Sequence, residues 1–97
     1  MSVAEQFGAN LARLRELADM SQEETAVRAG VHRTEVSQLE RGLRIARVDT
    51  VAKLAASLEI DPGELFEGIK WTPGTVRIGR FVEERRIHDV PESNPDR

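Results

Sequence analysis

Five side chains able to donate hydrogen bonds fall within seven consecutive residues near the middle of the chain: His32, Arg33, Thr34, Ser37 and Gln38. An imidazole, a guanidinium, two hydroxyls and an amide can recognise a partner by donating and accepting hydrogen bonds. No cluster of nucleophile, base and metal ligands accompanies them, so we expect no enzymatic activity. The chain has no cysteine and only two histidines, which lie far apart, so we expect neither a metal nor another cofactor.

The charge of the chain is unevenly distributed. The formal net charge is −3, yet five arginines lie between Arg28 and Arg47, against only Glu35 and Glu40. The segments on either side are acidic. The sequence therefore predicts one basic side on an otherwise acidic protein.

Size and composition are those of an ordinary soluble domain. The 97 residues fit one domain with one modest core, and 39% of them are hydrophobic and 32% charged. No apolar run approaches the roughly 20 residues that span a bilayer, and the N-terminus does not resemble a signal peptide. We expect a cytoplasmic protein without membrane contact.

The first helices are predicted from apolar spacing and end signals. Between Val3 and Ala18, one apolar face recurs at helical intervals; it consists of Phe7, Leu11, Leu14 and Ala18. A second helix is predicted to begin at Gln22, because Ser21 and Glu24 have the spacing of a capping box. Gly30 is placed to end this helix, after which Val31 points inward.

Three further helices are expected. A tight turn leads into one that opens at His32, buries Val36 and Leu39, and stops at Gly42. After a loop over 43–47, the next helix has a strong apolar stripe, formed by Val48, Val51, Leu54, Ala55 and Leu58. Asp61 and Pro62 are typical of the start of a short fifth helix.

The character of the sequence changes after Lys70. Trp71, Pro73 and Gly74 are expected to break the helix. Four residues beyond them share one face of a possible strand over 75–82: Val76, Ile78, Arg80 and Val82. Residues 83–97 are charged or proline-rich and predict a mobile tail. We therefore expect a helical domain over 1–70 and a C-terminal extension over 71–97.

Two segments carry a resemblance to a known family: Ser21-Gln22-Glu23-Glu24-Thr25-Ala26 through Ala29-Gly30-Val31, and Val36-Ser37-Gln38-Leu39-Glu40-Arg41-Gly42. Together with the order of the helices, they resemble the repressor and Cro-like (XRE-type) helix-turn-helix family over about 70 of the 97 residues. The resemblance implies an all-α, five-helix, lambda-repressor-like DNA-binding domain, here with a short C-terminal extension.

In such a motif, the side of the third helix that faces away from the core enters the major groove. This side would carry His32, Arg33, Thr34, Ser37 and Gln38 as base-reading residues. Arg33 suits guanine, Gln38 suits adenine through two hydrogen bonds, and Thr34 can contact a thymine methyl group. The alternative is an ordinary solvated helix face, with His32 as a capping or surface residue.

The resemblance also indicates residues that contact the DNA backbone. Gln22 resembles the family's phosphate-contacting glutamine, and Arg44 and Arg47 lie in the loop where the family holds the sugar-phosphate chain. Arg41 would help from the end of the third helix. Alternatively, the three arginines are only solubilising charges.

Four further positions bear on this resemblance. Arg15 and Glu40 occupy positions where family members often form an internal ion pair, which we take as structural. Thr25 departs from the leucine or isoleucine that is usual there, so Thr25→Leu is expected to stabilise the domain. Glu35 would repel phosphate unless it accepts from a cytosine amino group or pairs with an arginine.

The extension offers a second kind of contact. Trp71 is an anchor for an interface or else a cover for the helical core. The apolar side that includes Val76, Ile78 and Val82 would be buried by the same strand of a second subunit, or by folding back on its own domain. The sequence leaves open whether dimerisation uses the fifth helix, this strand or both, and we favour the extension.

These features predict a transcriptional regulator that binds double-stranded DNA as a homodimer. Its reading helices would enter successive major grooves of an inverted repeat, about 34 Å apart, and by covering a promoter it would act as a repressor. The alternative is an antitoxin-like module whose residues 71–97 wrap a partner protein.

Overall fold

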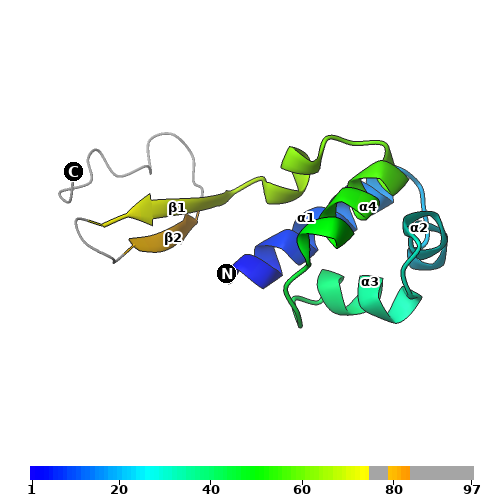
Figure 1. Cartoon of the computed structure of the whole chain (residues 1–97), viewed down its shortest axis with the longest axis horizontal. Coiled ribbons are helices and arrows are strands. Elements are labelled where there is room, and N and C mark those ends of the chain that lie inside the picture. Colours follow the sequence, from blue (N-terminus) through cyan, green and yellow to red (C-terminus); the bar gives the residue numbers. More distant parts are fainter. Residues whose placement is uncertain (75–78, 84–97) are drawn as a thin grey trace. The chain divides into compact units, whose positions relative to one another are not determined.

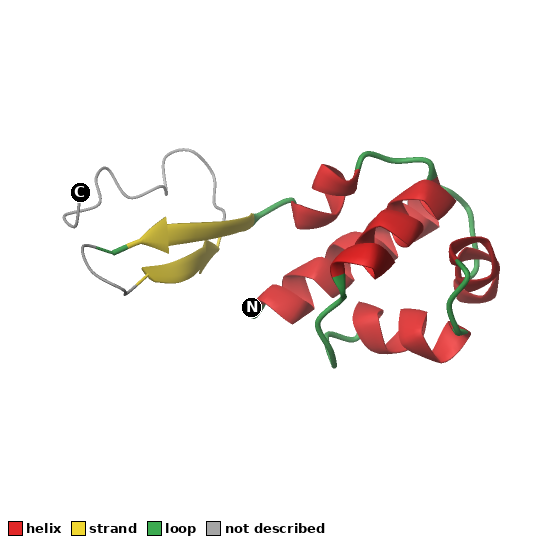
Figure 2. Cartoon of the chain, viewed as in Figure 1, coloured by secondary structure: helices red, strands yellow, loops and turns green. Residues whose placement is uncertain are grey.

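The structure is a computed structural model that describes residues 1–74 and 79–83 (Figure 1). The contacts divide the chain into two units, Met1–Glu67 and Gly68–Arg97. Figure 2 shows that the helices of the described residues belong to the first unit and the strands to the second. No described helix is both long and apolar enough to cross a membrane. The described residues also contain no group of three side chains suited to hold a metal ion.

The first unit contains four α-helices and one short 3-10 helix within the described residues: α1 (Val3–Leu17), α2 (Gln22–Ala29), α3 (Arg33–Glu40), α4 (Val48–Leu58) and η1 (Pro62–Phe66). Helix α1 packs on α3 and on η1, while α2 packs on α3 and α4. In Figure 1, α3 and η1 lie on opposite sides of the α1–α4 pair. The largest fully buried hydrophobic side chains come from these elements: Leu11, Val36, Leu39, Leu54 and Leu65.

The helix ends follow local chemistry. The Ser21 hydroxyl accepts a hydrogen bond from the backbone N–H of Glu24 at 2.9 Å, which satisfies one of the free donors at the start of α2. Gly30 ends α2 in the left-handed conformation, with φ of 71°. Helix α3 begins at Arg33, and the side chain of His32 makes no capping bond.

The expected fifth α-helix is a 3-10 helix instead. The backbone N–H of Glu64 bonds to the carbonyl of Asp61, three residues earlier. With Pro62 and Gly63 at its start, this five-residue segment is too short to establish the α-helical pattern. Buried Asn10 of α1 contributes as well, because its amide donates to the carbonyls of Leu65 (2.9 Å) and Glu67 (2.8 Å).

The second unit has two strands where one was expected. Strand β1 (Ile69–Pro73) pairs antiparallel with β2 (Gly79–Glu83), and Trp71 lies opposite Phe81. Trp71 and Pro73, which were expected to break the helix and to lie before the strand, are therefore part of a strand. Val76, Ile78 and the predicted tail beyond Glu83 lie outside the described residues.

Cross-strand aromatic packing explains why this segment is extended. The rings of Trp71 and Phe81 meet edge to face with centroids 5.1 Å apart. A Cβ at Gly79 would lie only 2.2 Å from the Trp71 indole. The indole therefore fills the space that a side chain at position 79 would need. An aromatic ring that covers a glycine on the neighbouring strand is a known device for fixing strand pairing.

A nearly buried ion pair joins α1 to α3. Arg15 Nε lies 2.6 Å from Glu40 Oε2, and the side chains are only 14% and 7% exposed. Arg15 also donates to the carbonyl of Met20, and Gln22 donates to Glu40 Oε1 at 2.9 Å. The hydrogen bond to Glu40 raises the pKa of Arg15 above its ordinary value, so Arg15 keeps its positive charge. Through these bonds, the network connects the start of α2 to α1 and to α3.

Gly8 marks a close approach of α1 to α3, and its replacement by alanine is our first prediction. Alanine normally favours a helix over glycine by about 1 kcal/mol. A Cβ at position 8, however, would lie 2.2 Å from the backbone oxygen of Leu39. We expect Gly8→Ala to lower the free energy of unfolding by about 3 kcal/mol in urea denaturation. Exposed Ala9→Gly serves as a control and should cost about 1 kcal/mol. A stabilised Gly8→Ala variant would contradict the close approach.

Our second prediction concerns the ion pair. We expect Glu40→Gln to lower the free energy of unfolding by about 3 kcal/mol, because it leaves the largely buried charge of Arg15 without its partner. The exposed pair between Arg13 and Glu67, 3.2 Å apart, offers a matched control. Glu67→Gln should change the stability by less than about 1 kcal/mol. The free energies of unfolding are measured by thermal denaturation. Equal decreases in the two variants would show that the buried Arg15–Glu40 pair contributes no more to stability than the exposed pair.

Candidate nucleic-acid interface

Small side chains let α2 and α3 cross closely. Ala26 and Ala29 on α2 are 2% and 5% exposed, and Val36 on α3 is fully buried. After Gly30 reverses the chain, the N–H of Val31 bonds to the carbonyl of Ala26 at 3.0 Å. The turn is thereby fixed by backbone hydrogen bonds, and it sets the direction in which α3 leaves α2.

The face of α3 opposite its buried residues is polar. Thr34 and Gln38 lie one turn apart on this face, since residues four positions apart are neighbours on a helix. His32, Arg33 and Thr34 are exposed, while Ser37 and Gln38 are partly buried. The structure thus brings the five predicted base-reading residues to one surface, with Arg33 towards its α2 edge.

Two carboxylates lie close to this surface. Arg33 Nε is 3.9 Å from Glu23 Oε2 of α2, and both side chains are more than half exposed. Such an exposed pair is weak and can exchange for a stronger partner. Glu35 is partly buried, and it forms no ion pair with an arginine in the part of the chain that the structure describes.

The side chain of Gln22 has a partner inside the protein. Its amide nitrogen, the group that would donate to a phosphate, donates to Glu40 Oε1 in the ion-pair network. This nitrogen carries two N–H groups, so a phosphate contact would use the second one. The sequence carries no signal for this arrangement, because residues 22 and 40 are brought together only by the crossing of the helices.

The arginines of the loop continue the polar face of α3. Arg41, Arg44 and Arg47 are all exposed; with Arg33 they form what we call the basic surface. Arg44 Nη1 donates to Gln38 Oε1 at 3.1 Å, and Arg47 Nε lies 3.3 Å from Asp49.

Gly42 directs the loop. It has φ of 71°, and a Cβ there would lie within 2.9 Å of Glu5 on α1. The backbone at this point therefore passes directly against α1, which keeps the loop beside the end of α3.

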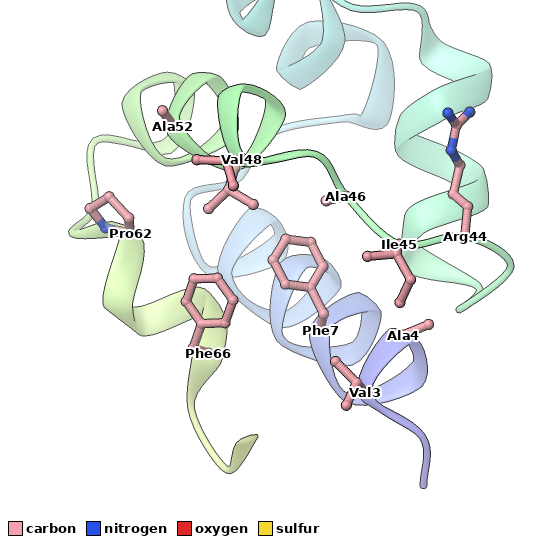
Figure 3. A pocket seen from close by; sticks show the side chains of 11 residues that line it. Val3, Ala4, Phe7, Arg44, Ile45, Ala46, Val48, Ala52, Pro62 and Phe66 are labelled. Atoms are coloured by element: carbon pink, nitrogen blue, oxygen red, sulfur yellow. The ribbon is translucent and has the colours of Figure 1, made fainter. Parts of the chain in front are cut away.

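A second feature, an apolar groove, was not predicted from the sequence. It holds about 450 Å³ and is lined by residues of α1, the loop, α4 and η1 (Figure 3). Val48, expected in the apolar stripe of α4, is 88% exposed because it is the first residue of that helix. Ile45 is 66% exposed, and the rings of Phe7 and Phe66 meet at 5.9 Å. The sequence signal that could have indicated this groove is the run after Gly42, in which apolar residues are interspersed with arginines.

The hairpin separates two residues that were expected to act together. Trp71 and Phe81 lie on one face and are each more than half exposed, at 53% and 54%. Val82 pairs with Lys70, so it lies on the other face. Trp71 and Val82 therefore cannot belong to one flat contact surface of the hairpin.

Comparisons with known proteins agree with this geometry. The helix-turn-helix family model HTH_3 matches residues 11–65, more than half of the chain. Control protein C.BamHI of Bacillus amyloliquefaciens is 34% identical over 62 residues, which are 63% of this chain and 76% of that protein. An uncharacterized HTH-type transcriptional regulator of Sinorhizobium fredii, y4dJ, is 37% identical over 73 residues, or 75% of this chain and 95% of that protein.

Solved structures show the same relationship. The restriction-modification controller protein C.AhdI from Aeromonas hydrophila superposes with a TM-score of 0.64 at 40% sequence identity. The match covers 65% of this chain and 96% of C.AhdI. The chain therefore belongs to the HTH_3 (XRE-type) helix-turn-helix family of DNA-binding transcriptional regulators.

Proposed function

We propose that this protein is a sequence-specific regulator that represses transcription by binding double-stranded DNA as a homodimer at an inverted repeat. The observation that carries the proposal is the continuity of the exposed polar face of α3 with the basic surface. One part of such a surface can contact base edges while the other contacts phosphates. By covering promoter DNA, the bound dimer would exclude the polymerase.

Each part of the surface has its own chemistry. Thr34 and Gln38 project from the middle of the exposed side of α3, where base edges of the major groove would lie. Arg33 suits the two acceptors of guanine, and its weak pair with Glu23 is readily given up. Arg41, Arg44 and Arg47 supply positive charge for phosphates on either side of the groove.

We place the dimer contact at the apolar groove. Val48, Ile45 and Phe66 expose a contiguous apolar surface around it, which a soluble monomer would leave in water. A second copy of the chain offers the same surface, so a two-fold axis would pair the two. Because the groove is lined partly by the loop that carries Arg44, pairing there would keep both basic surfaces close to the axis. The exposed Trp71 face of the hairpin is the competing contact.

Our third prediction tests DNA recognition. Selection from random duplex DNA with the full chain should enrich a palindromic site. Arg33→Ala should relax the preference at one base pair, at a cost of about 1–3 kcal/mol, because it removes a bidentate contact. Arg47→Ala should weaken binding to all sequences alike. It should also reduce the slope of the logarithm of the binding constant against the logarithm of the salt concentration by about one.

The control for this experiment is Arg13→Ala. Arg13 carries the same charge but pairs with Glu67, the residue that follows η1. In Figure 1, η1 lies on the side of the α1–α4 pair away from α3. It should leave both affinity and preference unchanged. If the unmodified protein enriches no sequence even at low salt, the DNA-binding proposal fails, and a protein-binding module becomes the leading account.

Our fourth prediction concerns the dimer. Val48→Glu should shift the protein to monomers in sedimentation equilibrium, because it introduces a charge into the apolar contact. Trp71→Ala should leave the dimer intact. The reverse outcome would assign dimerisation to the hairpin, and a monomeric unmodified protein at micromolar concentration would contradict the dimer altogether.

A further inference from the structure

Arg44 and Gln38, to which the sequence assigns different tasks, are bonded to each other. Arg44 was expected to contact phosphate and Gln38 to read a base. In the structure, Arg44 Nη1 donates to Gln38 Oε1 at 3.1 Å. In Figure 3, the guanidinium of Arg44 points along the ribbon of α3, consistent with this bond.

The backbone holds the two residues in this relation. After Gln38, the N–H of Leu43 bonds back to the carbonyl of Gln38 at 3.0 Å, and Gly42 bonds back to Leu39 at 3.0 Å. These bonds fold the loop against the last turn of α3. Arg44 is thereby held beside Gln38 by the main chain, and the side-chain bond adds to a proximity that already exists.

The bond determines which end of the Gln38 amide is available. Oε1 accepts from Arg44, whereas Nε2 has no hydrogen-bond partner among the described residues. No buried side-chain nitrogen or oxygen atom of the described residues lacks a partner, so Nε2 is open to solvent. Gln38 therefore presents a donor outwards, and the adjacent positive charge strengthens that donor by polarising the amide.

We propose that Arg44 determines specificity at the base pair that Gln38 contacts, by holding the Gln38 amide with its Nε2–H group towards the DNA. This inference rests on the proposed function. A donor selects base edges that offer acceptors, such as O6 and N7 of guanine or O4 of thymine. It rejects the amino group of cytosine.

Adenine also offers N7, but its N6 amino donor lies beside that acceptor and makes adenine the weaker partner. Two-bond recognition of adenine would need Oε1 to accept a second hydrogen bond besides the one from Arg44, and an oxygen that already accepts one bond is the weaker acceptor for another. This inference therefore favours guanine or thymine over the sequence-based assignment of Gln38 to adenine.

The other arginines of the basic surface do not share this property. Arg33 pairs with Glu23, and Arg47 pairs with Asp49. Within residues 1–74 and 79–83, neither forms a hydrogen bond with a base-reading side chain. Arg47, in the same loop, is therefore the matched control for a cation that acts on phosphate alone.

Our fifth prediction tests the role of Arg44 with the full-length protein and the site enriched by selection. Binding is measured for all four base pairs at each position of the site. Gln38→Ala identifies the base pair that Gln38 contacts. There we expect the unmodified protein to prefer guanine or thymine about tenfold, and Arg44→Ala to reduce that preference to within about twofold. In a Gln38→Ala background, Arg44→Ala should cause no additional loss of preference. Arg47→Ala should lower the binding affinity for every variant of the site by the same factor.

A readout without DNA accompanies this experiment. The side-chain amide resonances of Gln38 in the free protein should shift in Arg44→Ala and stay in place in Arg47→Ala, with unchanged circular dichroism in both. A uniform loss of affinity in Arg44→Ala, or unmoved Gln38 resonances, would overturn the role of Arg44 while leaving the proposed function intact. A protein that enriches no site would instead overturn the proposed function, and this inference with it.

Discussion

The ion pair between Arg15 and Glu40 sets the position of α3, on which the rest of the recognition surface depends. Two nearly buried charges stabilise a fold only when the geometry is good, since removing them from water costs several kcal/mol. Here Arg15 makes two contacts to Glu40 and one to the carbonyl of Met20, so its donors are well used. Gly8 permits the helix backbones to approach each other closely. The ion pair and the close approach at Gly8 require the same placement of α1 and α3. A different packing of the two helices that would satisfy one of these contacts would break the other.

The same network shows how folding and recognition share groups. Gln22 donates to Glu40, and Arg33 lies near Glu23, so two residues expected to contact DNA have internal partners in the free protein. Gln22 is expected to contact phosphate, which every site offers, so its bond to Glu40 does not discriminate between sites. Arg33 is expected to read a base, so it leaves Glu23 only where the base offers a stronger partner. This competition lowers non-specific affinity more than specific affinity, because only the correct site offers that base. The negative net charge of the chain acts in the same direction.

The parts of the structure that were predicted correctly are those determined by neighbours in sequence. The start of α2 after Ser21, its end at Gly30 and the buried positions Val36 and Leu39 all follow from local spacing. The errors occur where residues distant in sequence determine the local structure. Asn10 accommodates the 3-10 geometry of η1 from another helix, and Trp71 stabilises a strand by packing across to Phe81 and Gly79. The candidate base-reading residues were named from their pattern, and their role in reading bases stays a prediction. The bonds of Gln22 to Glu40 and of Arg44 to Gln38 depend on helix crossing and loop direction, which the pattern does not contain.

The division of the chain into two units has a consequence for how the function is built. Every residue of the basic surface, the reading face and the apolar groove lies in Met1–Glu67, and the family match ends at residue 65. The second unit begins at Gly68, which has φ of 82°, a backbone conformation that favours glycine. A two-stranded hairpin is marginally stable in water by itself, yet this one exposes half of its tryptophan. Because the residues proposed to contact DNA all lie in the first unit, the hairpin contributes no side chain to that surface, and the exposed aromatic face of Trp71 and Phe81 offers a contact of a different kind.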